Sequence, residues 1–375
     1  PSAASFGGGG LCLYRSPEGG VESLDFLVRR AADGGSVGVP GTVRGLALLQ
    51  ARHGRLSFDG LVSLAERLAL DGVPVSKTLA RDLARVSEGM AEGSSLARRF
   101  RAVDGGPLRE GDRLVQPELA AFLSLLRSRG AGDAYAGSSA GLIAEGADRH
   151  GGALRPADLW SYQTGKAPAL ALGRGDRVLV MPGERTGSGI LHVAAAERAI
   201  AMAEGAWPDA ALIARSTGDE LLARGASALP EHPGSSAFLV VGRDGEAVAC
   251  GLTMGAVFGR LEVVPEFGVV LASSPEGASG LASAFLAPVF VADPEGREIF
   301  LVAAAAGGPE AVSASLAAGF GTARPERVTA LSDAEPRGAA HLLVCPEGLL
   351  RAPESCRYAA DPAREGVALI ARGPR

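Results

Sequence analysis

The stretch PGSSAFLVVGRDGEAVACGLT, residues 233–253, decides the fold class. It contains two short apolar runs, Ser236–Val241 and Ala247–Thr253, whose composition favours β-strands. Arg243-Asp244-Gly245 separates the two runs, and an Asp-Gly pair is typical of a turn. We therefore expect two strands joined by a turn.

Further β-like runs lie closer to the C-terminus. The sequence predicts strands at Leu261–Leu271 (interrupted by a turn at Pro265–Gly268), Pro288–Ala292, Glu298–Ala304, His341–Cys345 and Gly366–Ala371. Between the third and fourth of these, Gly307-Gly308 leads into a helical stretch, Ala311–Ala318. Strands and helices do not alternate regularly in this half of the chain.

The first half is richer in helices. The sequence predicts Val43–Arg52 before Gly54, Leu61–Leu70 between a cap at Ser57 or Asp59 and Gly72, a helix from Gln116-Pro117 to Gly130, and a short helix from Pro156. In the second of these, Leu61, Leu64 and Leu68 recur at helical spacing. Gly7–Gly10, where we expect close backbone packing, precedes a buried strand at Leu11–Tyr14. Helices followed by a cluster of strands favour an α+β fold over a doubly wound parallel sheet.

Composition and charge exclude several classes of protein. The 375 residues carry 37 Lys and Arg against 42 Asp and Glu, so no basic surface for nucleic acid is expected. The longest apolar run, Ile299–Ala306, is far shorter than the ~20 residues of a membrane span. The histidines lie far apart, without metal-ligand spacing. The sequence thus predicts no nucleic-acid partner, no membrane span, no metal and no cofactor.

The cysteines and the first residue bear on the cellular compartment. The four cysteines, Cys12, Cys250, Cys345 and Cys356, include no C-x-x-C pair. The last two could form a disulfide in an exported protein, but the sequence favours buried free thiols. The chain starts without Met or a recognisable leader, so we expect a start inside a longer precursor. The compartment stays open between cytoplasm and periplasm.

Several segments in order resemble gamma-glutamyltranspeptidases, members of the N-terminal-nucleophile (Ntn) hydrolase superfamily. The matching segments are Ser5–Gly10, Leu24-Asp25-Phe26, Val37–Val43, Leu114–Leu119, Gly151–Leu159, Thr186–Ile190, Asp244-Gly245 with Ala247-Val248, Phe258-Gly259, Gly307-Gly308 and Ala360-Asp361-Pro362. They cover nearly the whole chain. The resemblance implies a four-layer αββα sandwich formed by one domain, residues 1–375.

The resemblance also implies a proenzyme that cuts itself before a Thr or Ser. Aligning Phe238 and Asp244-Gly245 with the family pattern places that residue at Ser235, and Ser236, one step away, stays open as the alternative. A cut there would leave a large part, 1–234, associated with a small part, 235–375. His232 is a further candidate for assisting the cut. The alternative is a purely structural role, in which Ser235 belongs to a turn that leads into a strand.

The chemistry implied is acyl transfer from gamma-glutamyl amides such as glutathione. A Ser hydroxyl needs a base, and the α-amino group that the cut exposes has a pKa of ~7.7–8.0. The freed amine of Ser235 would take the hydroxyl proton, and the resulting acyl-enzyme would react with water or with an amine. By resemblance, Gly307 and Gly308 supply backbone donors to the oxyanion, and Thr253 orients the amine.

The substrate-binding positions depart from the family pattern. Leu27 stands where the family has an Arg that binds the glutamyl carboxylate, and the nearest replacements are Arg29 and Arg30. Glu276 is the candidate ligand for the substrate amino group, and Ser283 is the candidate for a pair of serines that this chain lacks. Two alternatives follow: an enzyme of the same mechanism for a different acyl group, and an unprocessed, inactive binding or structural module.

Overall fold

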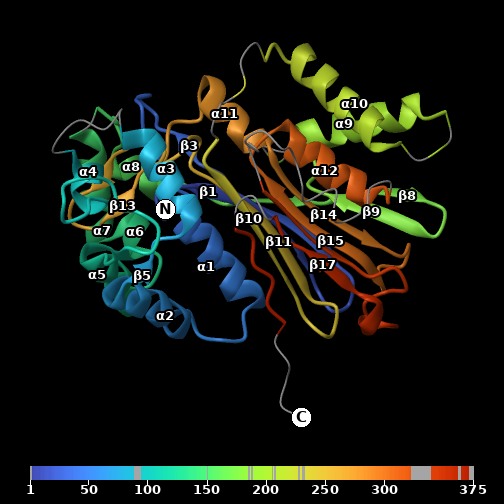
Figure 1. The fold of residues 1–375 in the computed structure, drawn as a ribbon, viewed down its shortest axis with the longest axis horizontal. Coiled ribbons are helices and arrows are strands. Elements are labelled where there is room, and N and C mark those ends of the chain that lie inside the picture. Colours follow the sequence, from blue (N-terminus) through green and yellow to red (C-terminus); the bar gives the residue numbers. More distant parts are fainter. Residues whose placement is uncertain are drawn as a thin grey trace.

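The computed structural model of this chain contains two antiparallel β-sheets packed face to face, with helices on both outer sides (Figure 1). It describes residues 2–87, 94–149, 151–184, 186, 189–204, 206, 208–226, 229, 233–321, 339–361 and 365–370. The architecture is the expected four-layer αββα sandwich, and the α+β class is confirmed.

The five-stranded sheet has the order β10-β11-β1-β2-β7, and all neighbouring strands are antiparallel. Its strands are β1 (Gly9–Arg15), β2 (Val21–Phe26), β7 (Gly165–Pro168), β10 (Ser235–Val241) and β11 (Ala247–Thr253). The runs on either side of Arg243-Asp244-Gly245 form β10 and β11, as the sequence predicts. β10 starts one residue earlier than expected, so Ser235 is its first residue.

The six-stranded sheet has the order β17-β16-β15-β14-β9-β8. Its strands are β8 (Leu170–Arg174), β9 (Arg177–Met181), β14 (Leu286–Ala292), β15 (Ile299–Ala306), β16 (Ala339–Val344) and β17 (Arg357–Ala359). β14 and β15 are buried along their whole length because the first sheet covers one face and helices cover the other. This double cover explains their unbroken apolar sequences.

Three two-stranded sheets complete the strands of the described residues. They are β3 (Arg29–Arg30) with β4 (Gly38–Val39), β5 (Val73–Pro74) with β6 (Arg113–Leu114), and β12 (Val263–Val264) with β13 (Val269–Val270). The last pair lies within the predicted run Leu261–Leu271 and turns where expected. The predicted strand Gly366–Ala371 is wrong for residues 366–370, because β17 already occupies that edge of the sheet and Leu369 and Ile370 are exposed. Residue 371 lies outside the described ones.

The helices form the two outer layers and a separate group beside the sandwich (Figure 1). α1 (Thr42–His53) packs on the five-stranded sheet, and α9 (Gly189–Met202), α10 (Ala210–Ala223) and α12 (Pro309–Gly319) form the layer over the six-stranded sheet. The remaining helices are α2 (Phe58–Asp71), α3 (Lys77–Ser87), α4 (Ser95–Arg99), α5 (Pro117–Arg129), α6 (Asp133–Ala136), α7 (Ser138–Asp148), α8 (Pro156–Ser161), α11 (Gly277–Ala284) and the 3-10 helix Pro353–Ser355.

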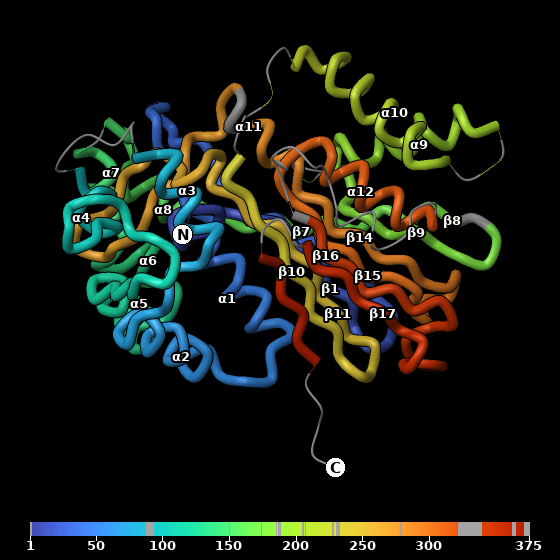
Figure 2. Tube along the Cα trace, in the orientation of Figure 1, coloured from blue at the N-terminus to red at the C-terminus, as the bar shows by residue number. Residues whose placement is uncertain are grey.

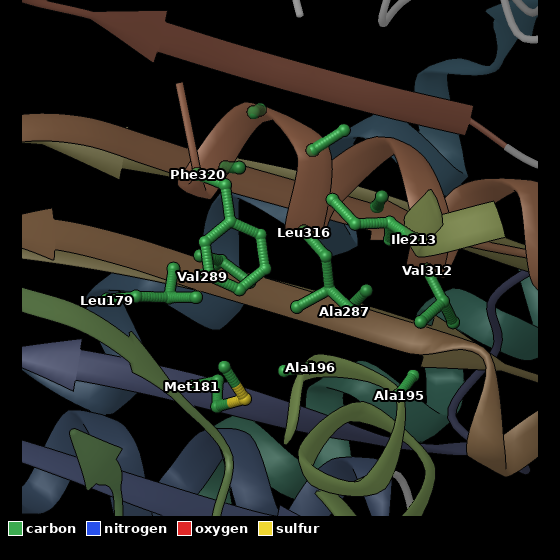
Figure 3. Close-up of a cluster of buried hydrophobic side chains, with 14 of the residues drawn as sticks. Leu179, Met181, Ala195, Ala196, Ile213, Ala287, Val289, Val312, Leu316 and Phe320 are labelled. Atoms are coloured by element: carbon green, nitrogen blue, oxygen red, sulfur yellow. The ribbon is translucent and has the colours of Figure 1, made fainter. Parts of the chain in front are cut away.

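The core is layered in the same way. Figure 3 shows Leu179 and Met181 of β9 and Val289 of β14 facing Leu316 of α12 and Ala196 of α9. A second apolar cluster fills the space between the sheets, and small residues of β11 and β15 let the sheets approach closely there. Apolar burial on the faces of the sheets thus holds the two sheets together.

α2 differs from its expected burial. Its limits agree with the prediction, since Ser57 caps its first turn and Gly72, with φ 78°, ends it. However, Leu61, Leu64 and Leu68 are 39%, 52% and 59% exposed. The helix instead packs on α5 through smaller side chains that include Val62, Ala65 and Ala69.

The expectation of free thiols is wrong. Cys12 of β1 is bonded to Cys250 of β11, and Cys345 is bonded to Cys356. Each pair joins segments that the fold makes neighbours: β1 and β11 are adjacent strands, and the second pair lies where β16 ends and β17 begins. Because the first two cysteines are 238 residues apart, the sequence alone does not show that they are neighbours.

None of the helices among the described residues is both long enough and apolar enough to cross a membrane. His, Cys, Asp and Glu side chains within the same ranges form no group of three that could hold a metal ion.

Candidate active site

Ser235 lies at the start of β10 with its side chain between the two sheets. It pairs with Thr253 at the end of β11, and both side chains are buried. The Ser235 hydroxyl donates to Thr253 Oγ1 at 2.9 Å. Both hydroxyls also reach the Pro233 carbonyl oxygen, at 3.2 and 3.3 Å. The structure therefore brings two of the expected site residues into direct contact.

Gly234 fixes the peptide that precedes Ser235. Its φ is 52°, and a Cβ atom there would lie 2.0 Å from the Ala256 carbonyl oxygen, so only glycine fits without a backbone shift. The Gly234 carbonyl accepts a hydrogen bond from the Met254 N–H at 2.9 Å. The Gly234–Ser235 peptide is thus held from both strands of the hairpin.

Ser236 lies on the opposite face of the same strand. It is half-buried and pairs with Leu252, whose side chain packs with the outer cluster under α1. Since successive side chains of a strand alternate between faces, only Ser235 points between the sheets. The structure therefore separates the two candidate serines by their surroundings.

Gly307 and Gly308 link β15 to α12. The Gly307 N–H donates to the Phe285 carbonyl at 3.1 Å, which continues the ladder between β14 and β15. Gly308 is the N-cap of α12, and its N–H finds no acceptor among the residues that the structure describes. The φ of Gly307 is 133°, a value that favours glycine.

The two glycines lie at the Ser235 end of the sandwich. A Cβ at Gly251, the partner of Ala237, would meet Leu286 at 2.9 Å, and Leu286 pairs with Ala306. Two residues further along β10 comes Ser235, and one residue further along β15 comes Gly307. The opposite ends of both hairpins also lie together, because Arg15 donates to the carbonyls of Gly245 and Gly296.

The candidate substrate-binding residues lie on neighbouring segments, and two of them contact each other. Arg30, rather than Arg29, forms an ion pair with Glu276 at 2.8 Å, and both side chains are exposed. Arg29 instead pairs with Asp25 at 3.1 Å. Ser283 is half-buried on α11 and is hydrogen-bonded to none of these groups.

Backbone hydrogen bonds connect these segments to the Ser235 hairpin. The Gly38 N–H of the β3–β4 hairpin donates to Ala272, and the Ser273 N–H donates to Met254, which itself contacts Gly234. The Arg30–Glu276 pair therefore borders the segment that follows β11. Leu27, where the family resemblance predicts an Arg, and Phe285, which follows α11, are both buried in apolar clusters.

Two buried tyrosines that the sequence does not single out support the Arg29–Arg30 segment. Tyr162 donates its hydroxyl to the Leu27 carbonyl at 2.9 Å, and Tyr135 donates to the Pro40 carbonyl at 3.0 Å. Burial raises the pKa of both phenols, so they stay protonated and remain donors. No sequence signal marks them, since a buried tyrosine has no characteristic spacing.

The glycine run before β1 has the expected packing role. A Cβ at Gly7 would lie 2.1 Å from the Val270 carbonyl oxygen, and one at Gly9 would lie 2.4 Å from the Val28 nitrogen. These close backbone approaches join β1 to the segments around the site. His232, the candidate for assisting a cut, lies outside the described residues.

Comparison with known proteins gives one family. Residues 1–197 match the family model described as gamma-glutamyltranspeptidase. The glutathione hydrolase proenzyme of Escherichia coli strain K12 is 30% identical over 215 residues, which are 52% of this chain and 37% of that protein. Glutathione hydrolase 7 of Homo sapiens is 31% identical over 213 residues, 51% of this chain and 31% of that protein. The chain thus spans about a third of the length of these curated relatives.

Solved structures share the fold over longer ranges. The cephalosporin acylase from Bacillus halodurans has a TM-score of 0.71 at 16% identity, covering 100% of this chain and 89% of that one. The gamma-glutamyltranspeptidase of Helicobacter pylori has a TM-score of 0.52 at 23% identity, covering 59% of this chain and 70% of that one. These likenesses concern the fold, and the family follows from the sequence match over the first half: the chain belongs to the gamma-glutamyltranspeptidase family.

Proposed function

We propose that the protein is a self-cleaving amidohydrolase and transferase for gamma-glutamyl amides such as glutathione, with Ser235 as nucleophile. The buried Ser235–Thr253 hydroxyl pair at the start of β10 carries this proposal. The names of the relatives, glutathione hydrolases, support the substrate class. The large part would be 1–234 and the small part 235–375.

The first step is the cut itself. The Ser235 oxygen attacks the Gly234 carbonyl carbon, the C–N bond breaks, and the hydroxyl proton passes to the nitrogen. Water then hydrolyses the resulting ester, which leaves a carboxylate on Gly234 and a free amine on Ser235. The hydrogen bond from the Met254 N–H polarises the attacked carbonyl. Thr253 holds the attacking hydroxyl in the site.

Turnover uses the amine that the cut releases. This amine takes the proton of the Ser235 hydroxyl as the oxygen attacks the substrate amide, and the departing amine receives a proton. Water then completes hydrolysis, or an amino-acid amine completes transfer. Gly308 is the better oxyanion donor of the two glycines, because the Gly307 N–H already serves Phe285.

The exposed Arg30–Glu276 pair is suited to a zwitterionic acyl group. An α-carboxylate would bind the guanidinium, and an α-ammonium would bind the carboxylate, each replacing one half of the existing ion pair. Arg29 is the second candidate for the carboxylate, at the cost of its contact with Asp25. Ser283, on the helix that follows Glu276, is the remaining candidate contact.

A different acyl group is the second candidate substrate. Leu27 and Phe285 are buried and apolar at two positions where a glutamyl group would need polar anchors. The cephalosporin acylase with the same fold is named for a different substrate, cephalosporin. Hydrolysis of a gamma-glutamyl anilide compared with a glutaryl anilide, which keeps the carboxylate but lacks the α-amino group, distinguishes the two.

A denaturing gel with reductant tests the central proposal. We expect two fragments, and N-terminal sequencing of the smaller one should start at Ser235. Ser235→Ala should give one full-length band and no hydrolysis of the anilides, whereas the matched control Ser236→Ala should still be cut. A full-length wild-type band would favour the unprocessed binding or structural module instead.

A further inference from the structure

The Cys12–Cys250 disulfide crosses the boundary between the two parts that self-cleavage would create. Cys12 lies in β1, within residues 1–234, and Cys250 lies in β11, within residues 235–375. The two residues are directly opposite each other in the antiparallel ladder. In Figure 2 the blue β1 and the yellow β11 lie side by side. Within the five-stranded sheet, the two parts meet along this pair of strands.

The disulfide is enclosed on the outer face of that sheet. Both cysteines are fully buried, and they pack with Phe26 of β2 and with Leu46 and Leu49 of α1. A reductant can reach the sulfur atoms only after α1 or the sheet edge opens. The bond is therefore protected as long as the fold is intact.

The second disulfide provides an internal comparison. Cys345 and Cys356 are 11 residues apart, and both lie after residue 235. This bond closes a short loop within the small part and cannot join the two parts. The two disulfides thus differ in a single relevant respect, namely which side of the cut each cysteine occupies.

We infer that the Cys12–Cys250 disulfide keeps the large and small parts covalently joined after the cut before Ser235. This inference rests on the proposed self-cleavage. The bond forms when two thiols exchange with the disulfide of an oxidant, such as a disulfide oxidoreductase; the oxidant takes up two electrons and two protons and becomes a dithiol. Formation of the bond therefore requires an oxidising compartment. Dissociation of the parts requires reduction as well as separation of the strands.

Non-reducing and reducing denaturing gels of protein whose free thiols were blocked before denaturation test the inference. Wild-type protein should give one band without reductant and two bands with it. Cys12→Ala/Cys250→Ala should give two bands in both lanes, whereas the matched control Cys345→Ala/Cys356→Ala should behave as wild type. Two wild-type bands without reductant would overturn the covalent link while leaving the self-cleavage intact.

A tryptic map of the unreduced protein keeps the two questions separate. It should contain the peptide that ends at Arg15 joined to peptide 244–260, and reduction should release both. One full-length band in both gel lanes would contradict the self-cleavage, and with it a link between fragments. The tryptic map would then show only whether the disulfide is present. Alkylated Cys12 and Cys250 in place of the joined peptides would overturn the inference whether or not the chain is cut.

Discussion

The two ends of the sandwich use the same strands for different purposes. At one end, β10 and β11 present the Ser235 and Thr253 hydroxyls between the sheets, with their hydrogen bonds made within that hairpin. At the other end, Arg15 is buried and ties the two sheets together through the carbonyls of Gly245 and Gly296. The contrast indicates that one end holds the sheets in place while the other positions the two hydroxyls.

The strongest expected effect on stability is at the Arg15 end. Burial lowers the pKa of Arg15, whereas the carboxylates of Asp293 and Glu298 raise it, so the charge is held by acceptors from both sheets. Arg15→Met would leave two carbonyls and nearby carboxylates without the cation, and should lower the free energy of unfolding by about 3 kcal/mol. Urea unfolding measures this loss.

The cut should survive that change. If the two ends have separate purposes, folded Arg15→Met protein still gives two fragments on a reducing gel at the wild-type rate. A variant as stable as wild type would show that Arg15 does not hold the sheets. A stable fold that fails to cut would show instead that the two ends are coupled.

A pair of glycine substitutions compares the ends directly. Gly234→Ala places a Cβ against the backbone oxygen of Ala256, and the strained φ adds to this, so we expect a loss of about 2 kcal/mol and at least tenfold slower cutting. At Gly245, whose φ of 81° is also positive, the nearest atoms are side-chain ends of Arg15 and Leu350 and not backbone, so Gly245→Ala should cost less, about 1 kcal/mol. Urea unfolding measures both losses of stability. If they are equal, the backbone contact at Gly234 is no more restrictive than the side-chain contacts at Gly245.

Thr253→Val tests the hydroxyl pair with little change in shape. It removes the partner of Ser235 Oγ and the acceptor of the Gly255 N–H. We expect about tenfold slower self-cleavage, equivalent to about 1.4 kcal/mol in activation free energy, with a similar loss of stability from the unpaired N–H. Thr253→Ser, which keeps the hydroxyl, should restore the cutting rate; failure to do so would argue against a role of the hydroxyl in the cut.

The sequence predicted the positions of the strands better than it predicted which strands pair with each other. β10, β11 and β1 follow from apolar runs and turns, which are local properties. The Cys12–Cys250 bond depends on which strands pair, and no local pattern carries that information. Alignment with the family pattern likewise pointed to Ser235. It could not tell that Glu276 contacts Arg30 rather than Arg29, because that depends on how two short segments are placed in three dimensions. The catalytic role of Ser235 stays a prediction.

The smallest expected effect is a pH dependence at the Arg15 end. Glu22 of β2 contacts Lys166, Arg52 and His53. Burial alone would raise the pKa of Glu22, but hydrogen bonds from these three groups outweigh it and lower the pKa to about 2. The folded state therefore favours the ionised carboxylate. Its contribution to stability is complete above the ordinary pKa of 4.5 and is lost as pH falls from there towards 2.

Glu22→Gln should remove this part of the acid sensitivity. Because Arg52 and Lys166 are substantially exposed, we expect a difference of about 1 kcal/mol or less between wild type and variant at pH 7. That difference should disappear near pH 2, as followed by urea unfolding over the pH range. The cutting rate at pH 7 should be the same in both proteins, since Glu22 lies at the end of the sheet away from Ser235. A variant that keeps the full wild-type acid sensitivity would show that this cluster does not stabilise the fold.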